Sequence, residues 1–555
     1  MYNLLIGGAA GQGVDTAAAI LEKLLKKSGY NVFATSDFMS RIRGGHNFIL
    51  LRFGTEVLMS HSDVLDGIIA LNDETVEVHK DKLQPGGFII GDSNLLTDDP
   101  RAVKIKMSDT AKELGNSRVA SSVALGAVLK LFGENLDLVS SVLETFFKQQ
   151  IVDINVKAFA AGYELVDNRF PRLHGKFSDW MTLSGSKAMS LGAVAAGLRF
   201  YSAYPMSPST SLMENLAEFC KKTAIVVEQA EDEIAAINMA IGASFAGARA
   251  MTATSGGGFS LMVEALGLSG IAEIPLVAAN FQRPGPATGL PTRTEQSDLK
   301  FVISASQGEF PRIVIALRNH TDSFYQTIRA FNLAEKYQIP VIILTDQYLA
   351  DATATVEPYD LTCIENEKPA QEKTGEGEYL RYKLTDDGIS PRLIPGKSKN
   401  FVLIDSDEHD ERGWITESAE MRVKMVDKRM SKLEKLQLEL QEPEYVGADD
   451  CEILLVGWGS TYGPIAEAIT RLNAENATYG ALIFGDIFPL PKKLLTEKSA
   501  KAKQIVNVEQ NATGQLADLI REQTGIACTS SILKYDGRQI SADEVVNRLL
   551  KEGQK

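Results

Sequence analysis

The sequence predicts an α/β protein built from several domains, each with a parallel sheet. Apolar, strand-like runs alternate with helical patterns through most of the 555 residues, as β-α-β units require. Glycine-rich turns follow a strand and precede a helix near both ends of the chain, at residues 7–13 and 457–463. A chain of this length exceeds one hydrophobic core and indicates roughly three or four domains of about 150 residues.

Composition and charge exclude several classes of function. The hydrophobic content of 44% is ordinary for a globular protein, and there is no apolar run of about 20 residues to span a bilayer. A net charge of −15 argues against nucleic-acid binding, which needs a basic surface. The N-terminus reads as a strand and not as a signal peptide, and the cysteines and histidines show no metal-binding spacing. We therefore predict a cytoplasmic protein without a metal site of its own.

Residues 1–175 are predicted to form the first domain, which opens with "YNLLIGGAAGQGVDTAAAILEKLLKKSGY". Its glycine turn has the context of a dinucleotide fingerprint, but the G-x-G-x-x-G spacing is absent. Asp37 is also poorly placed as a ribose ligand, so a turn that holds an anion at the helix N-terminus is favoured over a NAD site. Arg41 and Arg43 either grip a phosphate or carboxylate or are surface side chains of a packing loop, and neither interpretation is favoured.

Residues 176–357 show the clearest strand–helix repetition and are predicted to form the second domain. The turn "YPMSPST" carries hydroxyls that either contact a ligand or cap the next helix, and the cap is favoured. The loop "NFQRPGPATGLPTRTEQSDL" follows a strand end, where open α/β sheets bind their ligands. Arg283 and Arg293 in this loop are natural clamps for a carboxylate, so a functional loop is favoured.

A buried acid is predicted in the stretch "VVEQAEDEIAAINMAIGASFAGARAMTATSGGG". The helix dipole accounts for Glu231 and Asp232 in a first turn. Glu233 differs, because it shares a face with Ile237 and Ile241 in a helix that is apolar on nearly every side and is expected to be buried. A buried carboxylate needs a partner to offset its desolvation. That partner is either a basic nitrogen of a cofactor or a backbone cap, and the residues alone leave both open.

The rest of the chain divides into two parts. Residues 358–445 are polar and rich in proline and glycine, and they include the charged stretch "MRVKMVDKRMSKLEKLQLELQEPE". We interpret them as a linker with a surface or interface helix. Residues 446–555 return to the order of strand, glycine turn and helix, and are predicted to form the last domain.

Several motifs together resemble one known family. "GGAAGQGV", "SRIRGGHN", "YPMSPST", "EQAEDEIAAINMAIGAS", "TATSGGGFSLM" and "QRPGPATGLPTRTEQSDL" occur in an order similar to that of 2-oxoacid:ferredoxin oxidoreductase α subunits with a γ subunit fused at the N-terminus. The form it resembles is that of 2-oxoglutarate synthases. The resemblance implies a γ-type catalytic domain at 1–175, a pyrimidine-binding domain of thiamine diphosphate enzymes at 176–357 and a transketolase C-terminal-like domain at 446–555.

The resemblance also implies roles for single residues. Glu233 would be catalytic and bind thiamine diphosphate at N1′ of the aminopyrimidine ring, with Thr254 and Ser255 as further cofactor-binding residues. Where the family has Ile–Thr in its Y-P-I-T-P motif, this chain has Met206 and Ser207, which keeps the hydroxyl and changes the shape beside it. The substrate-binding residues would be Ser207, Arg283 and Arg293.

The expected enzyme decarboxylates a 2-oxo acid, with 2-oxoglutarate favoured, forms acyl-CoA from coenzyme A, and passes electrons to ferredoxin. The sequence holds neither a G-D-G…N grip for diphosphate and Mg²⁺ nor a cysteine cluster. A β subunit would supply the Mg²⁺ site and a 4Fe–4S cluster, in an αβ dimer or an (αβ)₂ assembly, and the isolated chain would be inactive. The alternatives are specificity for pyruvate or a branched-chain 2-oxo acid, a NAD-dependent dehydrogenase, and a non-catalytic assembly subunit.

Overall fold

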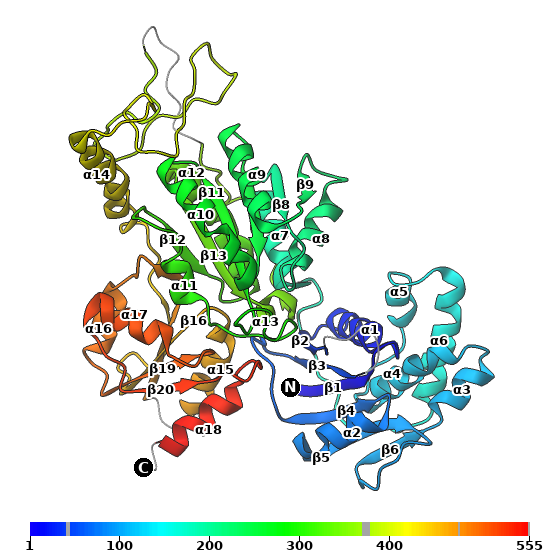
Figure 1. The fold of residues 1–555 in the computed structure, drawn as a ribbon. Coiled ribbons are helices and arrows are strands. Elements are labelled where there is room, and N and C mark those ends of the chain that lie inside the picture. Colours follow the sequence, from blue (N-terminus) through cyan, green and yellow to red (C-terminus); the bar gives the residue numbers. More distant parts are fainter. Residues whose placement is uncertain (40–44, 369–377, 475–477, 553–555) are drawn as a thin grey trace. The chain divides into compact units, whose positions relative to one another are not determined.

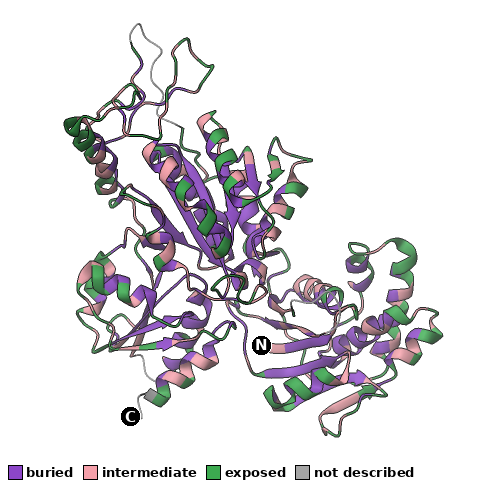
Figure 2. Ribbon diagram, in the orientation of Figure 1, coloured by how far each residue is buried: buried purple, intermediate pink, exposed green. Residues whose placement is uncertain are grey.

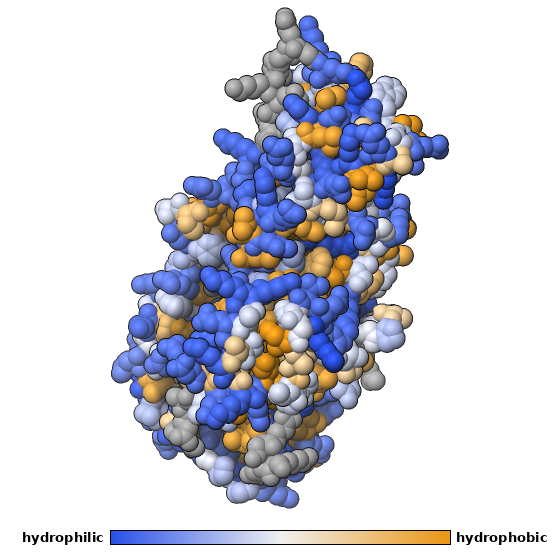
Figure 3. Space-filling model, turned by 90° about the vertical axis from the view of Figure 1, so that its left-hand side faces the viewer, coloured by the Kyte–Doolittle hydropathy of each residue, from blue (hydrophilic) through white to orange (hydrophobic). Residues whose placement is uncertain are grey.

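The structure is a computed structural model that describes residues 1–39, 45–368, 378–474 and 478–552. The chain divides into two compact units, the first made of Met1–Leu183, Ala352–Pro358 and Ser541–Glu544, and the second of the remaining residues. No helix within the described ranges is long and apolar enough to cross a membrane. On the face drawn in Figure 3, hydrophobic side chains form small groups among hydrophilic ones. The four predicted domain ranges stay predictions.

Unit 1 is built on an eight-stranded mixed sheet (Figure 1). β3 runs antiparallel to both β1 and β2, whereas β1, β4, β5 and β6 are mutually parallel. The connection from β2 to β3 is too short for the crossover helix that a parallel pair needs, which explains the antiparallel part. The sheet order is β6 (Ala102–Ile105), β5 (Leu83–Asp92), β4 (Leu65–Ala70), β1 (Tyr2–Ala9), β3 (His46–Gly54), β2 (Asn31–Asp37), β14 (Thr353–Val356) and β7 (Met181–Ser184).

Helices cover the unit 1 sheet and pack closely against one another. α1 follows the glycine turn, begins after Gly13 in the left-handed conformation, and packs on β1, β2 and β3. α4 and α6 approach so closely that a methyl group at Gly126 would overlap the carbonyl of Phe159. The helices of unit 1 are α1 (Val14–Lys27), α2 (Asp73–His79), α3 (Met107–Glu113), α4 (Ala120–Leu131), α5 (Val139–Leu143) and α6 (Gln149–Tyr163), with the short 3-10 helices η1 (Lys80–Lys82) and η2 (Ser117–Val119).

The first sheet of unit 2 has seven strands and is parallel except for β18. Its central strands are buried without interruption because helices cover both faces, as Figure 2 shows. Successive residues of β11 pack alternately, with Leu276 towards α9 and α10 and Val277 towards α7 and α12. The sheet order is β18 (Asp486–Phe488), β12 (Ile313–Ala316), β13 (Pro340–Asp346), β11 (Leu276–Gln282), β10 (Ala250–Thr254), β8 (Phe200–Ala203) and β9 (Val226–Gln229). The helices are α7 (Gly185–Ala195), α8 (Thr210–Phe219), α9 (Glu233–Phe245), α10 (Gly256–Ile271), α11 (Leu299–Ile303), α12 (His320–Tyr337) and α13 (Gln347–Asp351).

The second sheet of unit 2 forms the C-terminal part of the chain, and only β15 is antiparallel within it. Its core joins that of the seven-stranded sheet, so that Trp458 and Leu266 belong to one apolar cluster. The α/β class with mostly parallel sheets is therefore confirmed. The order is β15 (Glu444–Gly447), β17 (Tyr479–Phe484), β16 (Ile453–Trp458), β19 (Gln504–Glu509) and β20 (Ser530–Leu533), with helices α15 (Tyr462–Leu472), α16 (Lys493–Ser499), α17 (Gln515–Thr524) and α18 (Ala542–Glu552) and the 3-10 helix η3 (Gly459–Thr461).

The charged helix of the expected linker, α14 (Ala419–Leu436), buries cations against the seven-stranded sheet's helices. Lys428 and Lys432 donate from Nζ to the carboxylate of Glu273, at 2.6 and 2.5 Å, and all three side chains are buried. Arg381 donates to the main-chain carbonyl of Glu273, just past the C-terminus of α10. Cations are stabilised there by the helix dipole. One face of α14 is therefore buried within unit 2.

Candidate active site

The predicted acid lies at the start of α9. Asp232 is the N-cap residue, and its side chain accepts a hydrogen bond from the Ala235 amide at 2.8 Å. Glu233 is therefore not needed as a cap, and its side chain is only 3% exposed. The predicted buried stripe is confirmed, because Glu233, Ile237 and Ile241 are all buried. The opposite face of α9 is exposed, which corrects the expectation of burial on nearly every side.

The partner of the Glu233 carboxylate is a side chain of the neighbouring strand β10. Thr254 donates from Oγ1 to Glu233 Oε1 at 3.2 Å, and both residues are buried. Gly258, in the first turn of α10, lies against this pair, and a methyl group there would overlap both oxygen atoms. Met206 completes the surroundings with its sulfur 3.8 Å from Thr254 Oγ1. The bare backbone of Gly258 thus lets the Glu233 carboxylate and the Thr254 hydroxyl lie directly against the first turn of α10.

Further polar groups gather at the first turn of α10. Ser255 is the N-cap residue, and its fully buried hydroxyl has no hydrogen-bond partner among the described residues. Asp298 accepts from Asn280 Nδ2 at 3.0 Å and lies so close to Gly256 that a methyl group there would overlap it. Burial raises the pKa of Asp298, although the hydrogen bond from Asn280 acts to lower it. The unpartnered Ser255 hydroxyl, the Asp298 carboxylate and the bare backbone of the glycines are suited to contact a polar ring such as an aminopyrimidine.

The turn at residues 204–210 meets the arginine loop through its backbone. Arg283 donates from Nη1 to the carbonyl oxygen of Ser207 at 2.7 Å, and the Ser207 side chain is exposed. Ser209 donates its hydroxyl to the Met206 carbonyl at 2.7 Å and does not cap α8, so the favoured cap interpretation is wrong. The side chain of Ser209 is used instead to close its own turn.

The predicted site residues fall into two groups and one separate position. Glu233 and Thr254 are in contact, with Ser255 next in the chain, and Ser207 and Arg283 are in contact. Arg293 lies at the other end of the loop, where its Cβ packs against Gly537 of the C-terminal part.

Sequence reasoning did not single out Gly258, Asn280 or Asp298. The triple glycine "GGG" after Thr254 was a signal for a close approach, since each glycine offers bare backbone. The pairing of Asn280 with Asp298 had no local signal, because Asn280 lies within β11 and Asp298 ends the long loop.

The outward faces of α9 and α10 carry exposed apolar side chains beside this site. The two helices pack against each other on one face of the seven-stranded sheet. Ile234, Met239 and Leu261 are 51%, 42% and 48% exposed, although helices of soluble domains usually turn such residues inward. We call this surface the α9–α10 face.

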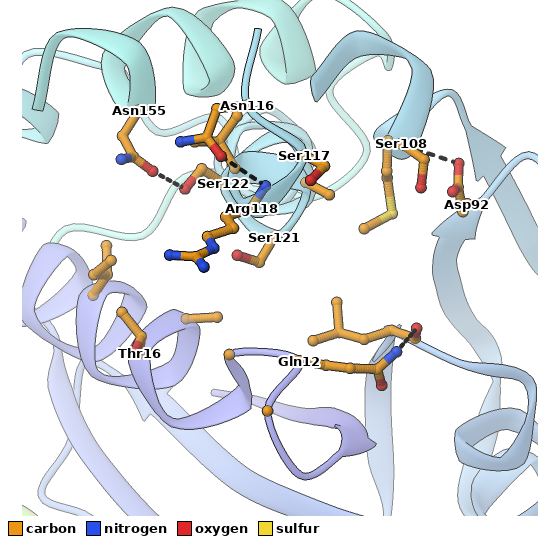
Figure 4. A pocket seen from close by; sticks show the side chains of 18 of the residues that line it. Gln12, Thr16, Asp92, Ser108, Asn116, Ser117, Arg118, Ser121, Ser122 and Asn155 are labelled. Atoms are coloured by element: carbon orange, nitrogen blue, oxygen red, sulfur yellow. Dashed lines mark hydrogen bonds between the residues drawn. The ribbon is translucent and has the colours of Figure 1, made fainter. Parts of the chain in front are cut away.

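Unit 1 contains a cavity of about 750 Å³ at the predicted glycine turn. One wall is the turn and the start of α1, with Gln12 and Thr16, and Arg118 and Ser121 point into the space from the opposite wall (Figure 4). Gln12 braces the turn, since its Oε1 accepts from the Ala9 amide at 2.7 Å. A helix N-terminus and a guanidinium on opposite walls suit a phosphate group. The predicted cations Arg41 and Arg43 lie outside the described residues.

The same cavity holds one fixed carboxylate. Burial acts to raise the pKa of Asp92, but hydrogen bonds from Ser108 and Ser93 outweigh it and leave the pKa below its usual value. Asp92 therefore stays ionised and can accept hydrogen bonds from hydroxyl groups.

Three family profiles match successive parts of the chain. The profile described as "Pyruvate flavodoxin/ferredoxin oxidoreductase, thiamine diP-bdg" matches residues 191–428, which include Glu233 and Thr254. "Pyruvate ferredoxin/flavodoxin oxidoreductase" matches residues 3–165, and "Pyruvate:ferredoxin oxidoreductase core domain II" matches residues 451–545.

The chain is also similar to individual proteins over its whole length. The 2-oxoacid:ferredoxin oxidoreductase subunit alpha of Sulfolobus sp is 34% identical across 99% of this chain and 96% of its own. The 2-oxoglutarate synthase subunit KorA of Methanothermobacter marburgensis is 30% identical across 66% of this chain and 98% of its own. A solved structure of 2-oxoglutarate:ferredoxin oxidoreductase from Magnetococcus marinus, with 2-oxoglutarate, coenzyme A and succinyl-CoA bound, is 32% identical, covers 99% of both chains and has a TM-score of 0.94.

Proposed function

Because this chain belongs to the 2-oxoacid:ferredoxin oxidoreductase α subunits, we propose that it provides the catalytic carboxylate for CoA-dependent oxidative decarboxylation of a 2-oxo acid. The observation that carries the proposal is Glu233, a buried carboxylate that accepts from Thr254 beside the bare backbone of Gly258. Two similar proteins are named for 2-oxoglutarate, which favours that substrate over pyruvate or a branched-chain acid.

The Glu233 site fits the aminopyrimidine ring of thiamine diphosphate. When bound, this cofactor supplies the carbon nucleophile and the electron sink for decarboxylation. Glu233 would hold and exchange a proton at ring nitrogen N1′, a task that needs a carboxylate fixed in position and shielded from water. Thr254 provides the fixing hydrogen bond, and the buried Ser255 hydroxyl would donate to the ligand.

Arg283 is the proposed clamp for the carboxylate of the 2-oxo acid. Its hydrogen bond to the Ser207 carbonyl holds the guanidinium beside the exposed Ser207 side chain. A guanidinium fork binds a carboxylate through two parallel hydrogen bonds. Arg293, at the far end of the same loop, is proposed for the distal carboxylate of a dicarboxylic substrate.

The unit 1 cavity is the proposed site of coenzyme A. The N-terminus of α1 and Arg118 face one another across a space large enough for a nucleotide. Asp92, kept ionised, would accept from ribose hydroxyls. A CoA-bound structure of a protein similar along the whole chain supports this choice of ligand.

A β subunit is the proposed partner of the α9–α10 face. This face borders Glu233, and its exposed apolar side chains are typical of an interface that is buried in an assembly. We propose that the β subunit grips the diphosphate with Mg²⁺, carries the 4Fe–4S cluster and reduces ferredoxin.

The decisive experiment is to purify the chain with its β subunit and measure CO₂ release and ferredoxin reduction with several 2-oxo acids and coenzyme A. Glu233→Gln in the complex should lower turnover by about 10²–10⁴-fold, the usual contribution of an acid–base group, without loss of assembly. Glu231→Gln is the matched control, because Glu231 is exposed and lies just before the N-cap residue of the same helix.

Three results would count against the proposal. These are turnover by the α chain alone, Glu233→Gln as active as Glu231→Gln, and NADH binding in place of coenzyme A binding in unit 1. The last would favour the dehydrogenase alternative.

A further inference from the structure

Gln296, in the arginine loop, is held by the C-terminal part of unit 2 through every polar atom it has. Its amide N donates to the Gln510 carbonyl at 2.7 Å, and its Oε1 accepts from the Gln510 amide at 3.2 Å. Its Nε2 donates to the Trp458 carbonyl at 2.8 Å, and its own carbonyl accepts from Asn511 Nδ2 at 3.1 Å. Gln296 is 0% exposed, so water competes for none of these bonds.

Residues on either side of Gln296 are held from the same direction. Thr294 donates its amide to the Gly537 carbonyl at 3.4 Å. Gln515 donates from Nε2 to the Ser297 carbonyl at 2.7 Å. The loop therefore meets the C-terminal part along residues 294–297 and not at one point.

The other side of the loop faces the Glu233 site. Two residues after Gln296, Asp298 donates its amide to Gln282 Oε1 at 3.0 Å and accepts from Asn280 Nδ2 at 3.0 Å. Its carboxylate lies against Gly256, two residues before Gly258. A displacement at Gln296 would therefore move Asp298 along the first turn of α10.

We propose that Gln296 is a positioning residue through which the C-terminal part of the chain sets the place of residues 283–298 against the first turn of α10. This inference rests on the proposed function, because Arg283 and Arg293 lie on that loop. A buried, fully satisfied polar network fixes one register more strictly than apolar packing, which tolerates sliding. The role assigned to the C-terminal part is thus to position substrate-binding residues that it does not itself contain.

The test replaces Gln296 by Leu or Ala in the complex with the β subunit. Leu keeps much of the volume and removes the hydrogen bonds, whereas Ala also shortens the side chain. The KM for the 2-oxo acid should rise by about tenfold or more, because small misplacements of a binding group have large kinetic effects. The KM for coenzyme A, assigned to unit 1, should change by less than about twofold. Gln326→Ala is the matched control, since Gln326 is a buried glutamine of α12 that bonds Gln441 far along the chain.

A second readout does not depend on activity. The sequence has three tryptophans, so replacing Trp180 and Trp414 by Phe leaves Trp458, the acceptor of the Gln296 bond, as the reporter. Gln296→Leu should change the emission of Trp458, and Gln326→Ala should not.

Outcomes separate the two proposals. An equal rise in both KM values, or no rise beyond the Gln326→Ala value, would overturn the positioning role. A native complex without 2-oxo acid turnover would overturn the proposed function, while the Trp458 emission would still decide whether Gln296 holds the loop.

Discussion

Thr254 Oγ1 lies 3.2 Å from Glu233 Oε1, and the hydrogen bond joins the last residue of β10 to the first residue of α9. The Thr254 hydroxyl can donate to the Glu233 carboxylate only while the carboxylate points along one direction. Asp232 caps the helix by accepting from the Ala235 amide, so Glu233 is not needed as the cap. The pair therefore fixes the direction of a buried carboxylate.

Thr254→Val should lower turnover of the complex by about tenfold to a hundredfold. Valine has the shape of threonine without the hydroxyl, and a hydrogen bond to a charged group contributes about 1.5–3 kcal/mol. Thr254→Ser keeps the hydroxyl and should restore most of the activity. Steady-state rates and thiamine diphosphate titrations on the three proteins measure the effect. Equal rates for the Val and Ser variants would show that the hydroxyl has no positioning role.

Gly258→Ala should lower the free energy of unfolding and weaken cofactor binding, whereas Gly257→Ala should not. A methyl group at Gly258 would overlap Glu233 Oε1 and Thr254 Oγ1, and forced overpacking costs about 1–3 kcal/mol. At Gly257 the nearest atom to such a methyl group is the Ala287 carbonyl oxygen, 3.8 Å away. Gly257→Ala should therefore raise the free energy of unfolding by about 0.5–1 kcal/mol, as removal of a helical glycine does. Urea unfolding measures the free energy of unfolding of the two variants. Equal values would show that Gly258 does not lie in close contact with Glu233 and Thr254.

Arg118→Ala should raise the KM for coenzyme A and leave the KM for the 2-oxo acid unchanged. Arg118 points into the unit 1 cavity opposite α1, where a phosphate would lie (Figure 4). Loss of a charge-assisted hydrogen bond corresponds to about tenfold or more. Arg169→Ala is the control, since Arg169 is exposed and donates to the Gly86 carbonyl outside the cavity. An unchanged KM for coenzyme A would place the ligand elsewhere.

Local patterns were enough to predict the elements that carry the site. The apolar runs at β10, β11 and β13 are buried on both faces and read as strands from the sequence alone. The spacing of Glu233, Ile237 and Ile241 predicted the buried stripe of α9, because helical periodicity is a property of neighbouring residues.

Contacts between distant residues could not be predicted in this way. β14 pairs with β2 although more than 300 residues separate Thr353 from Ala34, and no local signal encodes that pairing. Lys428 and Lys432 look like surface residues in the sequence, but Glu273 lies in a different segment and makes their burial favourable. Gln296 was missed for the same reason, because all its partners follow residue 457.

Acid should destabilise unit 1 through a buried histidine pair. The Nε2 atoms of His46 and His79 lie 2.8 Å apart, so one ring donates a hydrogen bond to the other. Burial and the neighbouring His46 lower the pKa of His79 to about 3, and burial also lowers the pKa of His46. As pH falls from about 6.5 towards 3, the unfolded chain takes up protons that the folded unit rejects, so stability is lost with falling pH. At pH 5 this costs about 2 kcal/mol for His79.

Thermal unfolding of His79→Phe at pH 7 and pH 5 measures that effect. Phenylalanine can pack against Phe48, whose ring lies 4.5 Å from that of His79, and it does not titrate. The variant should lose less stability than the native chain between the two pH values. His174→Gln is the control, since His174 is exposed and should leave the pH dependence unchanged. A variant as acid-sensitive as the native chain would remove His79 from the explanation.

The buried ion cluster of α14 provides the last prediction, a large loss of stability in Glu273→Ala. Burial acts to raise the pKa of Glu273, but Lys428, Lys432 and Arg381 outweigh it and hold the pKa far below its ordinary value. The carboxylate therefore contributes stability that is present above pH 4.5 and is lost as pH falls.

Removal of the Glu273 carboxylate leaves two buried ammonium groups unpaired, which costs about 3–5 kcal/mol in the free energy of unfolding. Glu420→Ala removes an exposed ion pair with Lys424 on the same helix, and solvent screening makes its expected cost much smaller. Urea unfolding at pH 7 compares the two, and at pH 3 the gap between them should narrow. A gap below about 1 kcal/mol at pH 7 would mean that the cluster does not hold α14 against the seven-stranded sheet.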